Sequence, residues 1–559
     1  MSAQKLGKVQ SVDTGNVTIL VENEAILNQV QVNQVVKIRS SRVNEEIVGM
    51  ITKILKKSSI DRIEEDLEET LVIENVVKVS LIGTLILKEG EQTNKFKRTL
   101  NVVPSIDSDC TLLESDSLSE FMTAISTQTD NPLSIGTYSI SENSICNLDG
   151  NKFFQRHATI VGGTGSGKSF TVANLIEKAS KLDSTCSLLF DLHGEYAPLA
   201  ALDNTEILKI AGPSDSTKTE GVFFLPYWLL SHEEIESLML DRSDSNAPNQ
   251  SRILFDTVIK LKKAQLEADN RDGVLENFTV DSPVPYKLTD LIDHIDAEDQ
   301  KMVPGSNGRE KQGPLFGKLT RFVQRLGSKK TDRRLNFLFN EESEVLDYDY
   351  LSLLIKKLLD FSENGIKIID FSEVPSDLLP MITGLMSRLI FSIQQWINEE
   401  KRHPIAIFCD EAHLYIPSET KTSIEEKALK SFERIAKEGR KYGLSLVVIS
   451  QRPSDVNKTV LSQCGNFVAM RLTNPDDQNV IRRLFPDNLG GFSEILPILD
   501  TGEAIIVGDA SLLPSRVLID KPSIAPKSAT VDFWDIWATE KQFDGYLEAV
   551  EALRKQKKD

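Results

Sequence analysis

Apolar and polar residues come close to alternating in several short runs over the first hundred residues. The runs read KVQSVDTGNVTILVE, NQVVKIRS, EEIVGMITKI and ENVVKVSLIGTLIL, and polar turns separate them. Alternation over short segments is typical of β-strands with one buried face, and several such strands at close spacing favour a small barrel. We therefore predict an N-terminal β-barrel over residues 1–100. Residues 101–150 show little periodicity and are rich in Ser and Asp, which indicates a connector.

The pattern changes to that of an α/β domain from residue 151 onward. Short apolar runs that each end in a polar residue occur at 158–161, 187–190, 366–369, 405–409 and 444–449. Buried parallel strands look like this, and their carboxyl ends carry the chemistry of open α/β sheets. We predict an α/β core with a parallel sheet in two parts, 151–224 and 351–520. The charged and mostly helical interval 225–350 is predicted to be a helical insertion, and residues 521–559 end in a Lys-rich helix with little core of its own.

The segment HATIVGGTGSGKSF contains a complete G-x-x-x-x-G-K-[ST] motif. Its glycines let backbone N–H groups turn inward around phosphate oxygens, the Lys168 ammonium can reach the β and γ phosphates, and the Ser169 hydroxyl can ligate Mg²⁺. An apolar strand precedes the motif, and a helix with apolar residues at helical spacing follows it. This context distinguishes a phosphate-binding loop from a chance glycine-rich loop. We predict that ATP and Mg²⁺ bind here. The predicted nucleotide-binding residues are Gly163, Thr164, Gly165, Ser166, Gly167, Lys168, Ser169 and Phe170.

A pair of adjacent carboxylates, Asp410 and Glu411, follows the apolar run IAIFC. On a parallel strand beside a phosphate loop, Asp410 would hold Mg²⁺ through its water shell, and Glu411 would activate the water that attacks the γ phosphate. The alternative interpretation is a plain helix cap, in which Glu411 stabilises the next turn. We predict that Ser169 and Asp410 are the metal-side residues and that Glu411 is catalytic.

The predicted strand at 444–449 leads to Gln451. A neutral amide at the tip of a central strand can sense the γ phosphate, because its hydrogen bond is lost on hydrolysis. The alternative is a polar turn residue that precedes a proline. We predict that Gln451 is the sensing residue of the catalytic site.

Residues 425–443 predict an amphipathic helix with an apolar stripe on one face. On another face, basic residues recur at steps of three, four and three, at Lys427, Lys430, Arg434 and Lys437. This face is either solvated and paired with Glu426 and Glu433, or it lines a channel for DNA. Arg440 follows the helix, in a position that suits a guanidinium reaching into the nucleotide of a neighbouring subunit.

The loop after the second apolar run carries Asp191, His193 and Glu195. A metal site is one interpretation of these three side chains, although no fourth ligand lies nearby in the sequence. The other interpretation is a structural role, or a role next to the ATP site.

Composition and charge limit the class of protein. The chain has 40% hydrophobic and 26% charged residues, and no apolar run is long enough to span a bilayer. The N-terminus lacks the apolar core of a signal peptide, and the five cysteines show no C-x-x-C spacing, so we expect a cytoplasmic protein without membrane association. A net charge of −19 argues against a surface that coats nucleic acid, because such binding relies on Lys and Arg. Any contact with DNA would be confined to a small region.

Five stretches of the chain form one ordered set of motifs. They read RHATIVGGTGSGKS, FDLHGEY, FCDEAHLYIP, EGRKYGLSLVVISQRPSDV and LSQCGNFVAMRLTNPDDQNVI. This set resembles that of the HerA-type ATPases, hexameric DNA translocases of the FtsK–HerA branch of P-loop proteins. The resemblance implies a RecA-like P-loop ATPase core, ATP and Mg²⁺ as cofactors, a homo-hexamer, double-stranded DNA as substrate, and a tail, 521–559, that braces an adjacent subunit.

The resemblance also assigns roles to single residues. It implies that Lys168 and Ser169 bind nucleotide and Mg²⁺, and it gives Asp410, Glu411 and Gln451 the roles predicted above. The family supplies a trans-acting arginine in the stretch that contains Arg440. It also has an arginine near the nucleotide at the position of Arg156.

Proteins of this type commonly act with a separate effector. Archaeal relatives resemble partners of the NurA nuclease in end resection, and bacterial ones resemble the motor of antiphage systems whose second protein is a nuclease or a Sir2-like enzyme. Two functions therefore remain for this chain. It is a motor that translocates duplex DNA together with an effector, or an ATPase scaffold that assembles and regulates the effector with little translocation of its own, and the fold alone cannot separate them.

Overall fold

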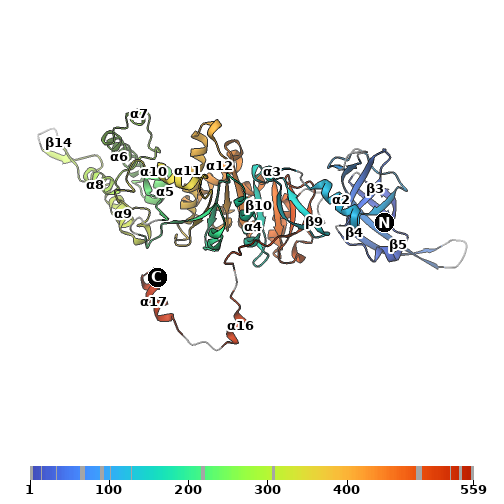
Figure 1. Cartoon of the computed structure of the whole chain (residues 1–559). Coiled ribbons are helices and arrows are strands. Elements are labelled where there is room, and N and C mark those ends of the chain that lie inside the picture. Colours follow the sequence, from blue (N-terminus) through green and yellow to red (C-terminus); the bar gives the residue numbers. More distant parts are fainter. Residues whose placement is uncertain are drawn as a thin grey trace. The chain divides into compact units, whose positions relative to one another are not determined.

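The N-terminal strands form a closed antiparallel barrel in the computed structural model (Figure 1). Neighbouring strands follow the order β2-β1-β7-β3-β4-β5, and β2 also pairs with β5, which closes the ring. Alternate apolar side chains such as Val17, Ile19 and Val79 fill the interior, as the sequence pattern predicts. The six strands are β1 (Lys5–Val12), β2 (Asn16–Leu20), β3 (Val35–Arg39), β4 (Glu45–Arg62), β5 (Glu69–Ile86) and β7 (Asp109–Leu112).

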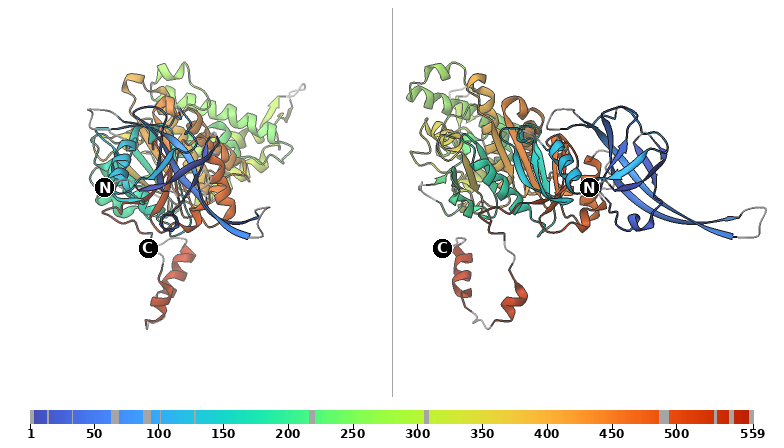
Figure 2. Two further views of the ribbon diagram at one scale, coloured as in Figure 1. Left: turned by 90° about the vertical axis from the view of Figure 1, so that its right-hand side faces the viewer. Right: turned by 45° about the vertical axis from the view of Figure 1, so that its right-hand side comes forward.

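Other elements border this barrel. Helix α1 (Glu24–Leu27) follows β2, and β6 (Lys95–Lys97) pairs with β5. Strands β4 and β5 continue past the ring as a two-stranded arm (Figure 2).

The structure describes most of the chain and divides it into two units. Unit 1 comprises residues 1–178, 447–454 and 461–523, and unit 2 comprises residues 179–446, 455–460 and 524–559. The description covers residues 4–555 except 14, 33, 63–68, 88–93, 101, 127–128, 216–220, 305–308, 486–493, 529–530 and 540–543.

The predicted connector, 101–150, contains regular elements. The four residues of β7 complete the barrel, and α2 (Ser115–Ile125) follows them. Strands β8 (Leu133–Tyr138) and β9 (Ser141–Leu148) then form an antiparallel hairpin. These strands are short and carry polar residues at many positions, so their pattern is too brief to distinguish them from loops in the sequence.

The sheet of unit 1 carries the phosphate loop. Its strands follow the order β18-β10-β19-β20-β21-β8-β9, with β10 parallel to both of its neighbours and the later pairs antiparallel. The strands are β10 (Ala158–Val161), β18 (Leu444–Ser450), β19 (Asn466–Met470), β20 (Glu503–Gly508) and β21 (Ser515–Ile519). The helices that accompany them are α3 (Gly150–Gln155), α4 (Lys168–Ser180), α13 (Lys458–Gln463) and α14 (Pro475–Leu484).

The sheet of unit 2 is parallel throughout, in the order β13-β12-β16-β11-β17. Leu188, Ile368 and Ile407 are fully buried in it, as expected for strands covered on both faces. Its strands are β11 (Ser187–Asp191), β12 (Thr205–Ile210), β13 (Val222–Phe223), β16 (Ile366–Asp370) and β17 (Ile405–Cys409). The long helices after β16 and β17 are α11 (Leu379–Trp396) and α12 (Ser423–Glu438).

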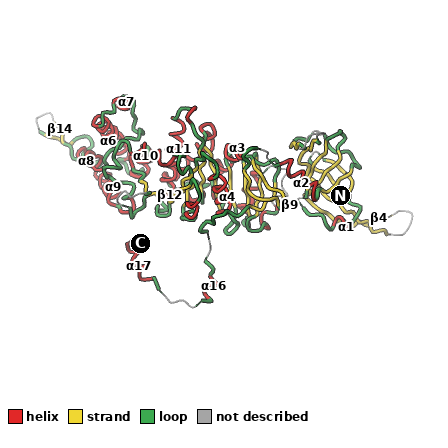
Figure 3. Tube along the Cα trace, viewed as in Figure 1, coloured by secondary structure: helices red, strands yellow, loops and turns green. Residues whose placement is uncertain are grey.

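The interval between β13 and β16 is mostly helical (Figure 3). Its elements are α5 (His232–Met239), α6 (Ala247–Ala268), α7 (Asp272–Leu275), α8 (Leu288–Asp299), β14 (Met302–Pro304), β15 (Glu310–Gln312), α9 (Thr320–Thr331) and α10 (Tyr350–Leu359). Buried aromatic side chains, among them Tyr227, Trp228 and Phe337, give this interval a core of its own. The predicted fold class is confirmed: a parallel α/β core with a phosphate loop, an N-terminal barrel and a helical insertion.

The C-terminal segment ends in two helices, α16 (Phe533–Trp537) and α17 (Tyr546–Lys555), in which no side chain is buried. Large apolar side chains stand exposed on both, including Trp534 at 81% and Leu547 at 85% exposure. Among the described helices, none combines the length and the apolar character that crossing a bilayer requires.

Candidate nucleotide-binding site

The phosphate loop joins the end of β10 to the start of α4. Val161 pairs with Ser450 at the carboxyl end of β18, and α4 begins at Lys168. Gly165 and Gly167 adopt φ angles of 71° and 107°, a region that residues with a Cβ rarely adopt. A Cβ on Gly162 would lie 2.4 Å from the Ser166 Oγ atom. The glycines of the motif are therefore required by the backbone path of the loop.

Hydrogen bonds at its two sides anchor the loop. The Gly163 amide donates to the Arg471 carbonyl at 2.8 Å, and the Gly502 amide donates to the Ser166 carbonyl at 2.9 Å. In contrast, the amides of Thr164, Gly165 and Gly167 donate to no acceptor within the described part of the chain. Orphan amides in a glycine-rich loop before a helix form an anion cradle. The loop therefore fits the phosphates of a nucleotide.

Three further predicted residues lie at this loop or directly after it. The Lys168 ammonium donates to the Gly163 carbonyl at 3.3 Å, so it folds back over the cradle. Ser169 and Phe170 occupy the first turn of α4, where the Phe170 side chain is 36% exposed.

The tip of β18 contacts the loop directly. The Thr164 hydroxyl donates to the Gln451 Oε1 atom at 3.0 Å. The predicted sensor and the phosphate loop are therefore brought together in unit 1 by the parallel pairing of β10 and β18. The motif treats Thr164 as a variable position, so the sequence pattern gives no signal for this contact.

Arg156 follows α3 and precedes β10. Its Nε atom lies 3.5 Å from the Asp509 Oδ2 atom, and both side chains are about half exposed. The neighbouring backbone is fixed by Asn466, whose amide donates to the carbonyls of Phe153 and His157 and whose Oδ1 atom accepts from the Ala510 amide. Asp509 and the Asn466 amide thus fix the position of Arg156, as far as the described residues show.

Acidic side chains gather at the carboxyl ends of three neighbouring strands of unit 2. Asp191 and Asp370 end β11 and β16 at paired positions, and Asp410 follows β17, which is the other neighbour of β11. Asp410 is buried, and burial raises the pKa of this carboxyl well above its usual range, with the charges of Glu411, Asp191 and Glu195 adding to the effect. A buried carboxyl among other carboxylates fits the ligand chemistry of Mg²⁺, whose charge would offset theirs.

Asp191 has a structural role in the loop that follows it. Its carboxylate accepts hydrogen bonds from the backbone amides of His193, Glu195 and Tyr196, at 3.3, 3.1 and 2.9 Å. Burial nevertheless raises the pKa of Asp191, because these bonds only partly oppose desolvation. Among the described residues no three metal-ligating side chains are placed so that they could hold one metal ion together, and the structural interpretation of this loop is the one that the geometry supports.

Glu411 turns away from the strand in a left-handed conformation, with φ 43° and ψ 44°. Such a conformation is costly for a residue with a side chain and is concentrated at functional sites. Its Oε2 atom lies 3.3 Å from the His413 Nδ1 atom, and the two side chains are only 16% and 13% exposed. His413 is therefore a candidate positioning residue for Glu411 that the sequence reasoning missed, although DEAH places both residues in one short motif.

Arg440 lies in the short 3₁₀ helix that follows α12, where its side chain is exposed. It forms no ion pair with another described residue.

The candidate site residues are divided between the two units. The phosphate loop, Gln451 and Arg156 belong to unit 1, whereas Asp410, Glu411 and Arg440 belong to unit 2.

The basic face of α12 is neutralised by carboxylates. Each cation lies within 4.0 Å of a glutamate. The pairs are Lys427 with Glu233, Lys430 with Glu426, Arg434 with Glu438 and Lys437 with Glu433. Of the two interpretations of this helix, the structure favours the solvated and paired face.

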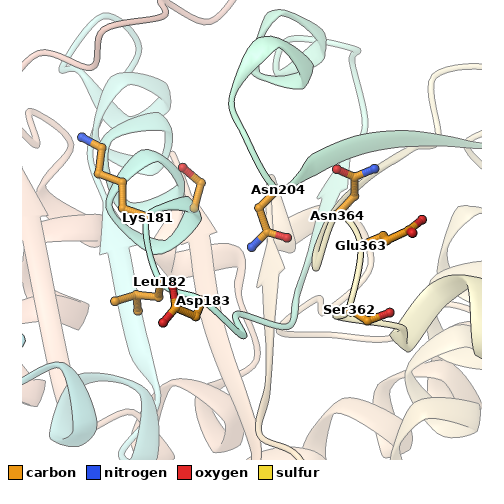
Figure 4. Close-up of a pocket in the computed structure, with 8 residues that line it drawn as sticks. Lys181, Leu182, Asp183, Asn204, Ser362, Glu363 and Asn364 are labelled. Atoms are coloured by element: carbon orange, nitrogen blue, oxygen red, sulfur yellow. The ribbon is translucent and has the colours of Figure 1, made fainter.

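A cavity of about 500 Å³ lies in unit 2 away from the predicted site residues (Figure 4). Its lining comes from segments that precede β11, β12 and β16, at the amino ends of these strands, and includes Lys181, Asn204 and Glu363. The chemistry of parallel sheets is found at the opposite, carboxyl ends. This cavity therefore does not belong to the candidate site.

Comparisons with known proteins identify the family. The model of the central domain of helicase HerA matches residues 133–390, and the model of the HerA-like C-terminal region matches residues 380–530. The chain belongs to the HerA family. The predicted family is therefore confirmed, and the matched region of this HerA-family chain contains every candidate site residue.

Several relatives that the chain matches bear the name HerA. The DNA double-strand break repair helicase HerA of Sulfolobus acidocaldarius is 27% identical over 66% of this chain and 65% of its own length. HerA of Saccharolobus solfataricus is 27% identical over 66% of this chain and 64% of its own length. A solved structure, VirB4 of Thermoanaerobacter pseudethanolicus, aligns with 71% of this chain and 98% of its own, with a TM-score of 0.46 and 16% identity. The chain thus spans slightly less than two thirds of these HerA relatives, which support the predicted class of enzyme, an ATPase.

Proposed function

We propose that the protein is an ATP-hydrolysing motor that forms a homo-hexameric ring and translocates or unwinds double-stranded DNA. The observation that carries this proposal is a phosphate loop, in a HerA-family chain, whose amides at Thr164, Gly165 and Gly167 have no acceptor among the described residues. ATP phosphates supply acceptors of the right charge, and Lys168 adds a cation for the β and γ phosphates.

The hydrolytic roles fall to four side chains. Ser169 and Asp410 hold Mg²⁺, which when bound supplies positive charge against the phosphates. Glu411, oriented by His413, accepts a proton from the attacking water as general base. Because Thr164 donates to the Oε1 atom of Gln451, the Nε2 atom of that amide remains available to donate to the γ phosphate.

The ring proposal rests on Arg440 and on the tail. Arg440 is exposed and unpaired among the described residues, as an arginine that completes a neighbouring subunit's site has to be. The apolar side chains of α16 and α17, such as Trp537 at 72% exposure, are the kind that an adjacent subunit covers. Arg156 is proposed to act in the site of its own subunit.

The experiment that tests this function measures ATP hydrolysis by the isolated protein with and without linear duplex DNA. A motor is stimulated by DNA, and the stimulation falls as salt rises, because counterions compete for the phosphates. The motor would be contradicted if duplex DNA did not change the rate of ATP hydrolysis at low salt in a sample whose rings are confirmed by sedimentation.

A mixing experiment tests the shared site. Arg440→Ala subunits should bind ATP and hydrolyse it poorly, and adding Lys168→Ala subunits should restore part of the rate. The restored interfaces are those that combine an intact cradle with an intact arginine. No recovery at any ratio, with subunit exchange confirmed, would show that Arg440 does not act across subunits.

The second candidate is an ATPase scaffold that assembles a separate effector, a nuclease or a Sir2-like enzyme, with little DNA translocation. The neutralised basic face of α12 favours this candidate, because it leaves the predicted channel surface without spare cations. We also propose such an effector for the motor, in a role such as antiphage defence. Hydrolysis that responds to the effector and not to DNA identifies the scaffold.

A further inference from the structure

The strongest local concentration of positive charge that we find lies in the helical insertion. The segment KLTRFVQRLGSKKTDRR, residues 318–334, contains seven cations and a single carboxylate, Asp332, for a net charge of +6. The whole chain carries −19. A basic segment within such an acidic chain needs a physical reason, because its cations repel one another.

Helix α9 arranges much of this charge on one face. Arg321, Arg325 and Lys329 recur every four residues and therefore share a face. Phe322 and Leu326 are fully buried and fix the helix against the rest of the insertion. The basic face is consequently held in place by the core beneath it.

Three of the seven cations are neutralised within the protein. Arg325 pairs with Asp241 at 3.1 Å, Lys330 with Glu341 at 2.9 Å, and Arg334 with Asp332 at 2.8 Å. The other four form no ion pair with any described residue. These four, Lys318, Arg321, Lys329 and Arg333, are called the α9 basic surface below. Three of them, Lys318, Arg321 and Arg333, are exposed.

The contrast with α12 is informative. On α12 each of four basic residues has a glutamate within 4.0 Å, three of them one turn away on the same helix. The sequence around α9 offers no such glutamates. Hydrogen bonds lower the pKa of Asp244 and Asp332, and the nearby charges of Arg321 and Lys329, respectively, add to this effect, but neither cation forms an ion pair with these carboxyls. Long-range attraction to a polyanion grows with the number of unneutralised cations rather than with the total number.

We propose that the α9 basic surface binds the phosphate backbone of double-stranded DNA. This inference rests on the proposed function and assigns the insertion a part in it. Arg321 and Lys329 are eight residues apart in the sequence and therefore lie about 12 Å apart along the helix axis, which is the length of three to four phosphates at about 3.4 Å each. Contacts of this kind hold the duplex without reading its sequence. In a ring the same contact is repeated in every subunit.

The test compares two triple variants of the full-length protein that lose the same charge. The α9 variant is Lys318→Gln, Arg321→Gln and Arg333→Gln, and the control is Lys430→Gln, Arg434→Gln and Lys437→Gln on α12. Binding of a fluorescent 30-base-pair duplex is measured by anisotropy from low to moderate salt. The α9 variant should bind about tenfold to hundredfold more weakly at 0.15 M salt, and its slope of log K against log salt should be shallower by about three. The control should retain the wild-type slope.

Each other outcome has a definite meaning. Equal affinity and slope for wild type and the α9 variant, or an equal loss in the control, would overturn the proposal. Duplex binding that survives while the α9 variant loses self-association would assign the surface to an acidic protein face and would also overturn it. If the wild-type protein binds no duplex at low salt, DNA is not its substrate, and the proposed function fails rather than the assignment of the α9 basic surface. If thermal melting shows that the triple variant unfolds, the three single variants replace it, each with a slope shallower by about one.

Discussion

Replacing Glu411 by glutamine removes one charge and almost no volume. The Glu411 side chain is 16% exposed, and its Oε2 atom lies 3.3 Å from the His413 Nδ1 atom. The amide of glutamine has nearly the same shape as the carboxylate and fits the same space. The amide cannot accept a proton from water. General-base catalysis contributes about 10² to 10⁴ in rate, which corresponds to about 3 to 5 kcal/mol at about 1.4 kcal/mol per factor of ten. We therefore expect kcat to fall by about two to four orders of magnitude.

The same Glu411→Gln substitution should not weaken the binding of nucleotide. The Glu411 charge is the largest electrostatic contribution to the raised pKa of Asp410, after burial itself. Removing it lowers the pKa of Asp410, so this carboxyl is ionised and able to hold Mg²⁺ over a wider pH range. The Glu411→Gln variant should consequently bind Mg²⁺ and ATP at least as tightly as the wild type.

Two assays separate these effects. Phosphate release under saturating ATP gives kcat, and titration with a fluorescent ATP analogue gives the dissociation constant. Glu419→Gln, an exposed glutamate in the segment after β17, is the matched control and should leave both values unchanged. A Glu411→Gln variant that hydrolyses ATP at the wild-type rate would refute the assignment of the general base.

Three further predictions use contacts of the described residues. His413→Ala should lower kcat without changing KM. In a Glu411→Gln background the same substitution should have no further effect on the residual rate, and an additive loss in this double variant would contradict a positioning role. Thr164→Val should release Gln451 and weaken the discrimination between ATP and ADP in binding assays, whereas Thr164→Ser should keep it; equal discrimination in both variants would show that the contact is irrelevant. Lys262 is buried in α6, and burial lowers its pKa to about 8. The unfolded chain keeps that proton up to about pH 10.4, so the free energy of unfolding of the insertion should rise by about 3 kcal/mol between pH 8 and 10.4. This rise should be absent in Lys262→Met, and hydrogen exchange at several pH values measures it; the same rise in that variant would assign it to another group.

The phosphate loop and the buried strands around it could be predicted because their signals are local. The motif requires Gly167, and this sequence adds Gly165 at a variable position; both adopt the positive φ angles that the path of the loop requires. The apolar runs before Asp410 and before Gln451 likewise predict buried strands, and both are buried strands in the structure. The barrel follows from alternation in the same way.

Other features depend on residues far apart in the sequence. The glutamate that neutralises Lys427 comes from α5, 194 residues earlier, so the paired state of the α12 face is decided by tertiary packing. Thr164 and Gln451 are 287 residues apart and meet only because β10 and β18 are neighbours. The Arg98 guanidinium of the barrel region donates to the carbonyls of Gly508, at the end of β20, and Leu512, which are more than 400 residues away in the sequence. Local patterns carry no information about such contacts.

Translocation along duplex DNA can be measured by the displacement of a third DNA strand. A triplex-forming oligonucleotide is bound to one end of a linear duplex, and its release is followed in the presence of the protein and ATP. If the protein is a DNA-translocating motor, the wild type should release the third strand in an ATP-dependent manner and the Glu411→Gln variant should not release it at all, because translocation requires hydrolysis. Steady ATP hydrolysis by wild-type rings at low salt without any release of the third strand would contradict the motor and leave the scaffold as the function.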